Sequence, residues 1–359
     1  MRKESGSVFI AKGIGIMLVV VGHYDPDCSP TYWSSLIKVI YSFHMPLFFV
    51  LAGYLCGLFP QQLNRYGNFV SKKASRLILP LISVTAIFML VKVVSGSLVE
   101  LRHPVNLHSI YAVVMNPMES YLPSIWFMYT LFLIFLIFPL LCFMVKQNAI
   151  ALCCLVLPGY FFDLPRTFCM NMVFASLPMF TFGYIAGKSK IQLDDIERSV
   201  AMLLSISGSV IYIYVCTLQN NIPTKLGLFL MSLSGSLVCI MMAVMINSFE
   251  NAFMRILRMI GLYSMTIYLL HPIFISPVRI GLHSILGFDG SVFLPGAFIA
   301  IAFGVACPVF LEKKLLRKNR LAKKYILGLT PKEPMDSLSV GSKTEERYPG
   351  GILGKLDSR

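Results

Sequence analysis

The chain has 359 residues, of which 56% are hydrophobic and only 13% are charged, with a mean hydropathy of +0.73. Soluble domains carry roughly 25% charged and roughly 45–50% apolar residues, so this composition excludes an ordinary soluble domain. Its long apolar runs instead predict an all-α, polytopic integral membrane protein built around a transmembrane cavity. The nine cysteines have no metal-type spacing, so we expect neither a metal site nor a disulfide framework.

Ten apolar segments are expected to cross the membrane, whose hydrocarbon core is about 30 Å thick. The first is expected to be a membrane helix and not a cleaved signal, because Lys12 interrupts it and no A-x-A-like site follows Gly22. The fifth and sixth are short and contain prolines, which are tolerated where helices line a cavity. The expected spans are residues 8–24, 35–58, 78–98, 124–145, 148–163, 171–187, 199–217, 225–248, 259–280 and 293–311.

The formal net charge of +14 is explained by membrane topology and does not require a nucleic acid partner. With the N-terminus in the cytoplasm, the inner segments as far as residue 324 carry nineteen Lys and Arg residues and the outer loops carry four. Positive charge gathers on the cytoplasmic side, so this distribution predicts an even number of spans and two cytoplasmic termini.

Two polar stretches lie outside the expected spans. The largest outer loop, about Gly96 to Pro123, is predicted to be solvated. Residues 326–359 are polar and lack an apolar pattern, so we expect a disordered cytoplasmic tail after a membrane domain of residues 1–325.

Lys12 and His23 lie eleven residues apart in the first expected helix. At about 100° per residue, eleven steps return to within roughly 20° of the start, so both side chains share one face. They are separated by about 16 Å along the axis, with His23 toward the outer surface. Either residue alone could simply sit at the headgroups, but an ionisable pair on one face of a membrane helix indicates a functional site.

Five stretches in this order resemble acyltransferase family 3, the bacterial integral-membrane O-acyltransferases, and the resemblance covers roughly residues 5–315. They are Lys12 to His23, Phe43 to Tyr54, Phe69 to Pro80 with Lys73 and Arg76, Trp126 to Met128, and Tyr263 to Pro272. The chain departs from the family at two positions. Lys12 stands where Arg is commoner, which keeps the charge but loses the bidentate fork, and Ala52 replaces a small hydroxyl residue.

The resemblance implies an enzyme of the bacterial inner membrane that moves an acyl group from cytoplasmic acyl-CoA to a carbohydrate hydroxyl outside. The expected donor is acetyl-CoA, and the expected acceptor is a surface polysaccharide or its lipid-linked precursor; no metal is expected. One alternative is a succinyl or other acyl group with a different acceptor. Others are a secondary transporter, for which we find no internal repeat, and a non-catalytic membrane scaffold.

His23 is the predicted general base, because an imidazole titrates near neutral pH and this one is expected at the outer end of its span. Asp25 or Asp27 could orient the ring, although a solvated turn around Pro26 explains at least one of them. We also place Asp25 among the predicted substrate-binding residues.

Lys12, Lys73 and Arg76 are the predicted acyl-CoA-binding residues, because the phosphates of the donor need cations. For Lys73 and Arg76 the cytoplasmic excess of positive charge is a simpler alternative.

His44, Trp126 and His271 complete the predicted substrate-binding residues. Each has a structural alternative: the two histidines directly precede Met45-Pro46 and Pro272, where a proline should kink or begin a helix segment, and Trp126 could belong to an interfacial aromatic belt.

Overall fold

The computed structural model describes residues 5–24, 29–96, 103–219, 224–286 and 290–329. These residues form helices, short 3-10 turns and one π-helical turn at Glu312–Leu316, and the described part contains no strand. The helices are α1 (Gly6–Gly22), α2 (Thr31–Gly57), α3 (Tyr66–Ser95), α4 (Leu107–Met115), α5 (Trp126–Met144), α6 (Ala149–Phe161), α7 (Met170–Lys188), α8 (Arg198–Gln219), α9 (Lys225–Ile246), α10 (Ala252–Leu262), α11 (Ser264–Leu286), α12 (Gly290–Leu311) and α13 (Arg320–Tyr325).

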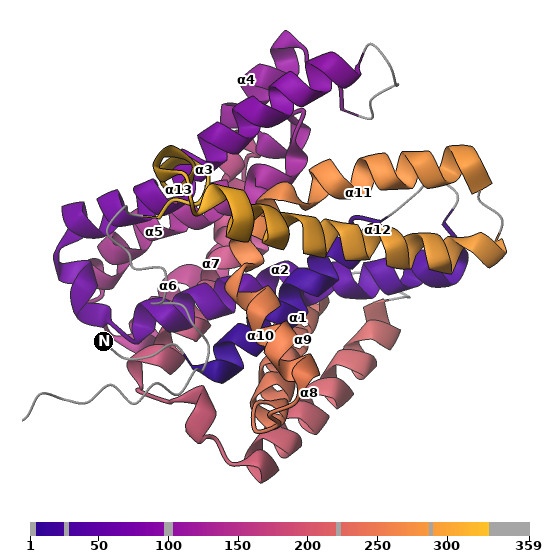
Figure 1. Ribbon diagram of the computed structural model, residues 1–359. Helices are drawn as coiled ribbons and strands as arrows, with labels where there is room; N and C mark the ends of the chain where they lie inside the picture. The colour runs from indigo at the N-terminus through magenta and orange to yellow at the C-terminus, as the bar shows by residue number, and fades with distance from the viewer. Residues whose placement is uncertain (1–4, 25–28, 97–102, 220–223, 287–289, 330–359) are drawn as a thin grey trace, which may run out of the picture.

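The predicted all-α polytopic fold is confirmed. Within the described ranges, eight helices are long and apolar enough to cross a membrane, and two shorter apolar helices are α1 and α6. These ten helices fall on the ten expected spans. One span differs: the run expected at 259–280 is interrupted at Tyr263, so that α10 ends there and α11 starts in a new direction (Figure 1). The expected outer loop also contains a short helix, α4.

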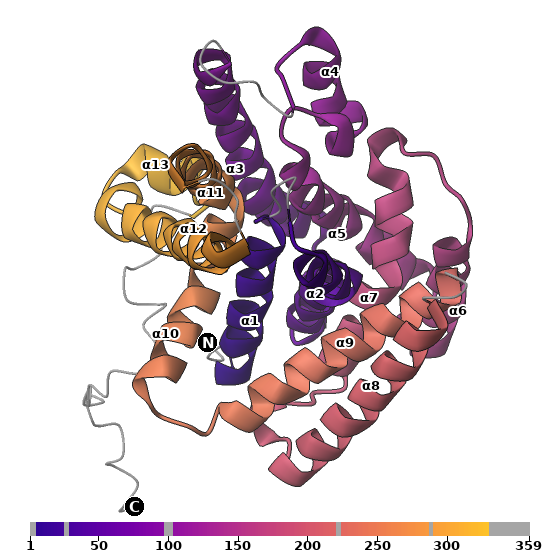
Figure 2. The ribbon, with the colours of Figure 1, turned by 90° about the vertical axis from the view of Figure 1, so that its right-hand side faces the viewer.

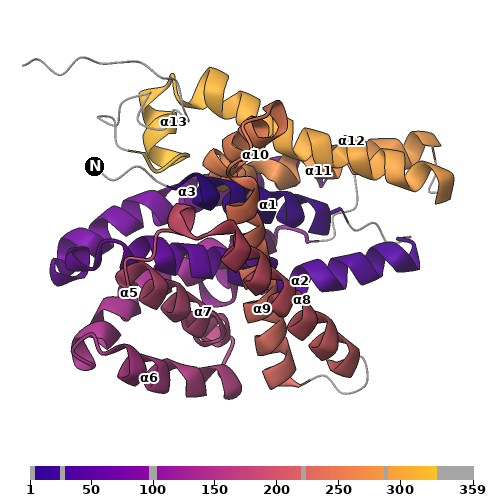
Figure 3. The same cartoon turned by 90° about the horizontal axis from the view of Figure 1, so that it is seen from below.

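The helices α1 and α2 lie near the centre of the bundle, and the other long helices surround them (Figure 2). Three pairs pack closely along their lengths: α2 with α7, α8 with α9, and α11 with α12. Seen from below, α5, α6 and α7 lie together, and α9 with α8 lies next to them (Figure 3).

Glycines bring α2 and α7 into backbone contact. A Cβ atom added at Gly53 would clash with the Phe180 carbonyl oxygen, and one at Gly183 would clash with the Val50 carbonyl oxygen. Gly57 and Gly187, one turn further on, repeat this arrangement. Small residues spaced four apart on both helices are the usual means of close helix association in membranes.

The last described segment returns to α3. Gly328 has a positive φ of 63° and contacts the backbone of Arg76, where a Cβ would lie 2.6 Å from the carbonyl oxygen. Leu327 is only 5% exposed. The packed chain thus extends at least to Leu329, four residues into the segment expected to be a tail, while residues 330–359 lie outside the described ranges.

Candidate functional site

Three histidines from three helices gather where α1 ends, and we call this the histidine end of the bundle. The rings of His23, at the C-terminus of α1, and His271, on α11, meet edge to face with 4.7 Å between centroids. His44, on α2, stacks on Tyr41 at 5.2 Å, and the Tyr41 hydroxyl donates to the Gly22 carbonyl at 2.7 Å. Tyr41 thereby connects the His44 ring to the end of α1.

Hydrogen bonds assign the same tautomer to all three rings. The Nδ1 atoms of His23 and His44 lie 2.8 and 2.7 Å from the carbonyl oxygens of Val19 and Ile40. The Nδ1 atom of His271 lies 2.8 Å from the Tyr268 carbonyl oxygen. Because a carbonyl only accepts, each Nδ1 must carry the proton, and each neutral ring keeps a lone pair on Nε2. A lone pair is what a general base needs.

The three rings differ in exposure. His44 is 5% exposed and His271 is fully buried, whereas His23 is only partly buried. Of these three residues, His23 has the largest exposed fraction. The role of general base for His23 stays a prediction.

The prolines beside the histidines lie inside their helices, so the expected helix starts at Pro46 and Pro272 are wrong. Both α2 and α11 continue through Pro46 and Pro272, and side chains satisfy the carbonyls that the prolines leave free. The Ser232 hydroxyl donates to the Ser42 carbonyl at 2.7 Å, and His271 Nδ1 donates to that of Tyr268. The structural alternative for His271 thus accounts for Nδ1, but its buried Nε2 has no hydrogen-bond partner among the described residues.

The remaining predicted acceptor-side residues are less informative. Asp25 and Asp27 lie outside the described residues. Trp126 begins α5 and packs against Phe49 and Phe127, each with 6.3 Å between ring centroids. Its ring therefore belongs to the contact between α2 and α5, and it is not among the residues that line the cavity described next.

A cavity of about 460 Å³ opens near the start of α1, and we call this the basic end. All three predicted donor-binding residues, Lys12, Lys73 and Arg76, line it. They come from α1 and α3, which are distant in sequence. The structure therefore brings together the three cations that the sequence predicted separately.

Aromatic rings hold two of these cations inside the cavity. The Lys12 Nζ atom lies 5.4 Å from the centre of the Phe9 ring, and the Lys73 Nζ atom lies 4.1 Å from that of Phe135. Both lysines are partly buried, whereas Arg76 is exposed at the cavity mouth. Contacts between a cation and an aromatic face stabilise a charge that is partly removed from water.

A layer of aromatic side chains lies between the cavity and the histidines. Phe48, Phe127 and Tyr268 line the inner part of the cavity. Tyr268 is 5.3 Å from Phe127 and 6.4 Å from His271, measured between ring centroids, and its hydroxyl donates to the Ser124 carbonyl. The ring of Tyr268 thus faces the cavity on one side and the histidine end on the other.

Sequence reasoning missed a buried ion pair in the cavity wall. Glu312 is 4% exposed, and its Oε1 atom accepts from Arg317 Nε at 2.9 Å and Nη2 at 2.8 Å. In the sequence, Arg317 stands out only as one of the nineteen cytoplasmic charges. The useful signal was a single acid at the end of an apolar span, followed five residues later by Arg.

Asp194, another lining residue that sequence reasoning missed, ties the loop before α8 to the start of α1. Its carboxylate accepts from the Ser5 hydroxyl at 2.7 Å and from the backbone N–H groups of Gly6 and Ser7 at 3.0 Å each. Burial acts to raise the pKa of Asp194, but the hydrogen bonds from these three residues outweigh it and hold the pKa below its ordinary value.

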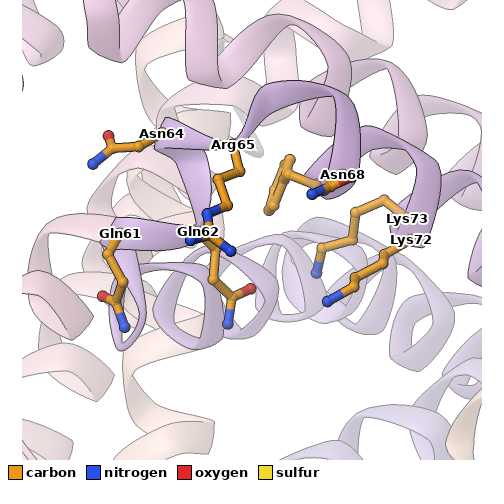
Figure 4. Close-up of a pocket in the computed structure, with 8 residues that line it drawn as sticks. Gln61, Gln62, Asn64, Arg65, Asn68, Lys72 and Lys73 are labelled. Carbon is orange, nitrogen blue, oxygen red and sulfur yellow. The ribbon is translucent and has the colours of Figure 1, made fainter.

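A second hollow of about 430 Å³ adjoins the cavity, and we call it the polar groove. Gln61, Gln62, Asn64, Arg65, Asn68, Phe69, Lys72 and Lys73 line it (Figure 4). Gln62 and Lys73 also line the cavity, so the two hollows are neighbours. The basic end therefore combines an aromatic and apolar cavity with an adjoining groove of amides and cations.

The fold and these two ends define a polytopic α-helical membrane protein with an imidazole cluster at one end and a basic cavity at the other. Residues 7–313 match a family model described as an acyltransferase domain. The chain belongs to this acyltransferase family, acyltransferase family 3. No match was found among curated proteins or among solved structures.

Proposed function

We propose that this protein is an O-acyltransferase that moves an acyl group, with acetyl as the first choice, from cytoplasmic acyl-CoA to a hydroxyl of an extracytoplasmic surface polysaccharide or its lipid-linked precursor. One observation carries the proposal. A single central helix, α1, presents Lys12 to a cavity lined by Lys73 and Arg76, and presents His23 to the opposite end with its Nε2 lone pair available.

In the proposed reaction, the acceptor hydroxyl gives its proton to His23 Nε2 while its oxygen attacks the thioester carbonyl carbon. The tetrahedral intermediate then collapses, the carbon–sulfur bond breaks, and the CoA thiolate leaves. That thiolate takes the proton from the imidazolium, which returns His23 to its starting state. The Val19 carbonyl keeps the proton on Nδ1 throughout and stabilises the imidazolium.

The donor is proposed to enter from the basic end. Lys73 and Arg76 would bind its phosphates by charge-assisted hydrogen bonds, and Lys12 would hold the pantetheine arm on its way inward. The acyl end must pass the layer of Phe48, Phe127 and Tyr268 to meet His23. This direction agrees with the proposed location in the bacterial inner membrane, with both termini in the cytoplasm, which the nineteen-to-four charge distribution supports.

The direct test has two parts. In the first, the purified protein in lipid nanodiscs is given acetyl-CoA labelled in its acetyl group. In the second, the surface polysaccharide from cells with and without the protein is compared by mass spectrometry. Transfer of label to a glycan would support the proposal, and so would an acetyl group that is present on the polysaccharide of cells with the protein and missing in cells without it. Transfer from succinyl-CoA alone would redirect it to another acyl group. Substrate uptake without acylation would instead identify a transporter, although one candidate intramembrane charge, Lys92, is already bound to the His103 and Tyr121 carbonyls.

A further inference from the structure

We propose that the polar groove binds the 3′-phosphorylated adenine nucleotide of the acyl-CoA donor, while the neighbouring cavity takes the pantetheine arm and the acyl group. This inference rests on the proposed function, because it divides one donor between two adjoining hollows. The residues that would form this nucleotide site are Arg65, Asn68, Lys72 and the amides of the turn before α3.

Charge in the groove favours a phosphorylated ligand. Three of the eight lining residues are cations, and none is acidic. The first turn of α3 has no acidic residue either, so the partial positive charge of the helix N-terminus adds to the field of Arg65 and Lys72. CoA carries a 3′-phosphate and a pyrophosphate, and such groups form strong hydrogen bonds with Lys and Arg.

The amides distinguish this groove from a simple cluster of cytoplasmic charges. Gln61, Gln62, Asn64 and Asn68 supply both donors and acceptors, and an Asn or Gln amide can pair with the N6 and N7 edge of adenine. In Figure 4 the ammonium ends of Lys72 and Lys73 extend toward the side of Gln62, whereas Asn64 points away from them. An excess of positive charge on the cytoplasmic side explains lysines but does not require amides.

The frame of the groove is held by its own hydrogen bonds. Backbone N–H groups of Gln62 and Arg65 donate to the carbonyls of Phe59 and Gln62, at 3.1 and 3.3 Å. The Tyr66 hydroxyl donates to the Leu136 carbonyl at 3.2 Å and so ties the start of α3 to α5. The groove is thus a formed surface whose side chains reach solvent.

A lipid headgroup carries phosphate chemistry too, but the groove fits a nucleotide better. Phe69 is the single apolar residue among the eight that line the groove, and it is 5% exposed. The groove also leads to the cavity through Gln62 and Lys73, which is the direction that a pantetheine arm would take.

The test measures binding of CoA, dephospho-CoA and S-acetylpantetheine to the full-length protein in nanodiscs of phosphatidylcholine. We expect the wild-type protein to bind CoA at least about tenfold more tightly than dephospho-CoA, since each charge-assisted contact contributes about this factor. In Arg65→Gln/Lys72→Gln this preference should disappear, while S-acetylpantetheine binding stays unchanged. The matched control, Arg255→Gln/Lys314→Gln, removes two exposed cations that line neither hollow and should keep the preference.

A second variant guards against misfolding. Gln61→Ala/Asn68→Ala keeps the net charge, alters two exposed side chains, and should weaken CoA binding while leaving S-acetylpantetheine binding unchanged. The inference is overturned if the wild-type protein prefers CoA to dephospho-CoA and both groove variants retain that preference. It is also overturned if the variants change only the retention of phosphatidylglycerol in mixed nanodiscs. Failure of the wild-type protein to bind CoA at all would reject the donor in the proposed function as well.

Discussion

The histidine end and the basic end place titratable groups in opposite settings. At the histidine end, backbone carbonyls fix the ring orientations of His23, His44 and His271, and the rings pack against aromatic neighbours. At the basic end, Lys12, Lys73 and Arg76 surround open volume. Proton transfer needs a fixed lone pair at one point, whereas binding a flexible polyanion needs room and charge. Under the proposed function, this contrast separates the chemical step and donor binding along α1.

The largest expected effect comes from removing the base at the histidine end. His23→Ala should reduce acyl transfer by a factor of about 10²–10⁴, the usual contribution of a general base, while acyl-CoA binding stays within about twofold of wild type. The measurement is transfer of labelled acetyl to glycan, with ligand binding in parallel. Lys38→Ala, at an exposed position of α2, serves as the control. If His23→Ala transferred acetyl at a near-normal rate, His44 or His271 would become the candidate general base.

Removing the cations at the basic end should give the opposite result. Lys73→Ala and Arg76→Ala should each weaken acyl-CoA binding by about 1.5–3 kcal/mol, through loss of charge-assisted phosphate contacts. Lys12→Ala should also weaken donor binding without a large folding defect, and Lys12→Arg should be tolerated because the charge remains. Calorimetric titration with acyl-CoA measures these changes. If Lys73→Ala and Arg76→Ala both bound acyl-CoA with wild-type affinity, these two cations would serve only to set the membrane topology.

The close contact of α2 and α7 can be weakened by a single methyl group. Gly183→Ala should destabilise the protein by about 1–3 kcal/mol, because the new methyl group meets the Val50 carbonyl oxygen and the backbones must separate. Gly281→Ala, where an added Cβ meets nothing within 4 Å, should leave stability unchanged or slightly raised. Thermal unfolding in nanodiscs compares the two. Equal melting temperatures would contradict the close contact.

The smallest expected effect concerns Asp194 and pH. The folded state lowers the pKa of this carboxyl, so its stabilising contribution is present above the ordinary Asp value of about 3.9 and is lost as the pH falls through the folded-state pKa. Asp194→Asn should therefore lower the free energy of unfolding at pH 7 by less than about 1 kcal/mol. Below the folded-state pKa of Asp194 the substitution should make little difference to this free energy. The measurement is unfolding at several pH values, with Asp195→Asn as the control. If Asp194→Asn lost the same free energy of unfolding at every pH, protonation of Asp194 would not be coupled to folding.

The sequence predicted the ten spans well, because apolar length and the proline positions carry that signal. It could not predict the break at Tyr263, since residues 259–280 are continuously apolar enough to be one helix and the break depends on α10 packing along α1. The spacing of Lys12 and His23 was readable because both lie on one helix. Glu312 and Arg317 were missed because their pairing depends on a π-helical turn at the end of α12.

The roles of the glycines in α1 also depend on packing between helices and could not be predicted from the sequence. From the sequence alone, Gly13 and Gly22 are compatible with helix packing and with a narrow channel. In the structure a Cβ at Gly13 would meet the Leu257 carbonyl oxygen on α10, and one at Gly22 would meet the Tyr41 ring. Both therefore serve packing, and only the position of the neighbouring helix could decide this.

The return of the chain to α3 at Gly328 has a consequence for biosynthesis. Ser5 and Leu329 line the same cavity, so its wall contains residues from both ends of the described chain. A ribosome adds about 5–20 residues per second and completes the N-terminal helices first. Residues His23, His44 and His271 are therefore all translated before Leu327 and Leu329 exist. A nascent chain that has stalled after α12 would hold the imidazole cluster but lack part of the wall of the cavity at the basic end.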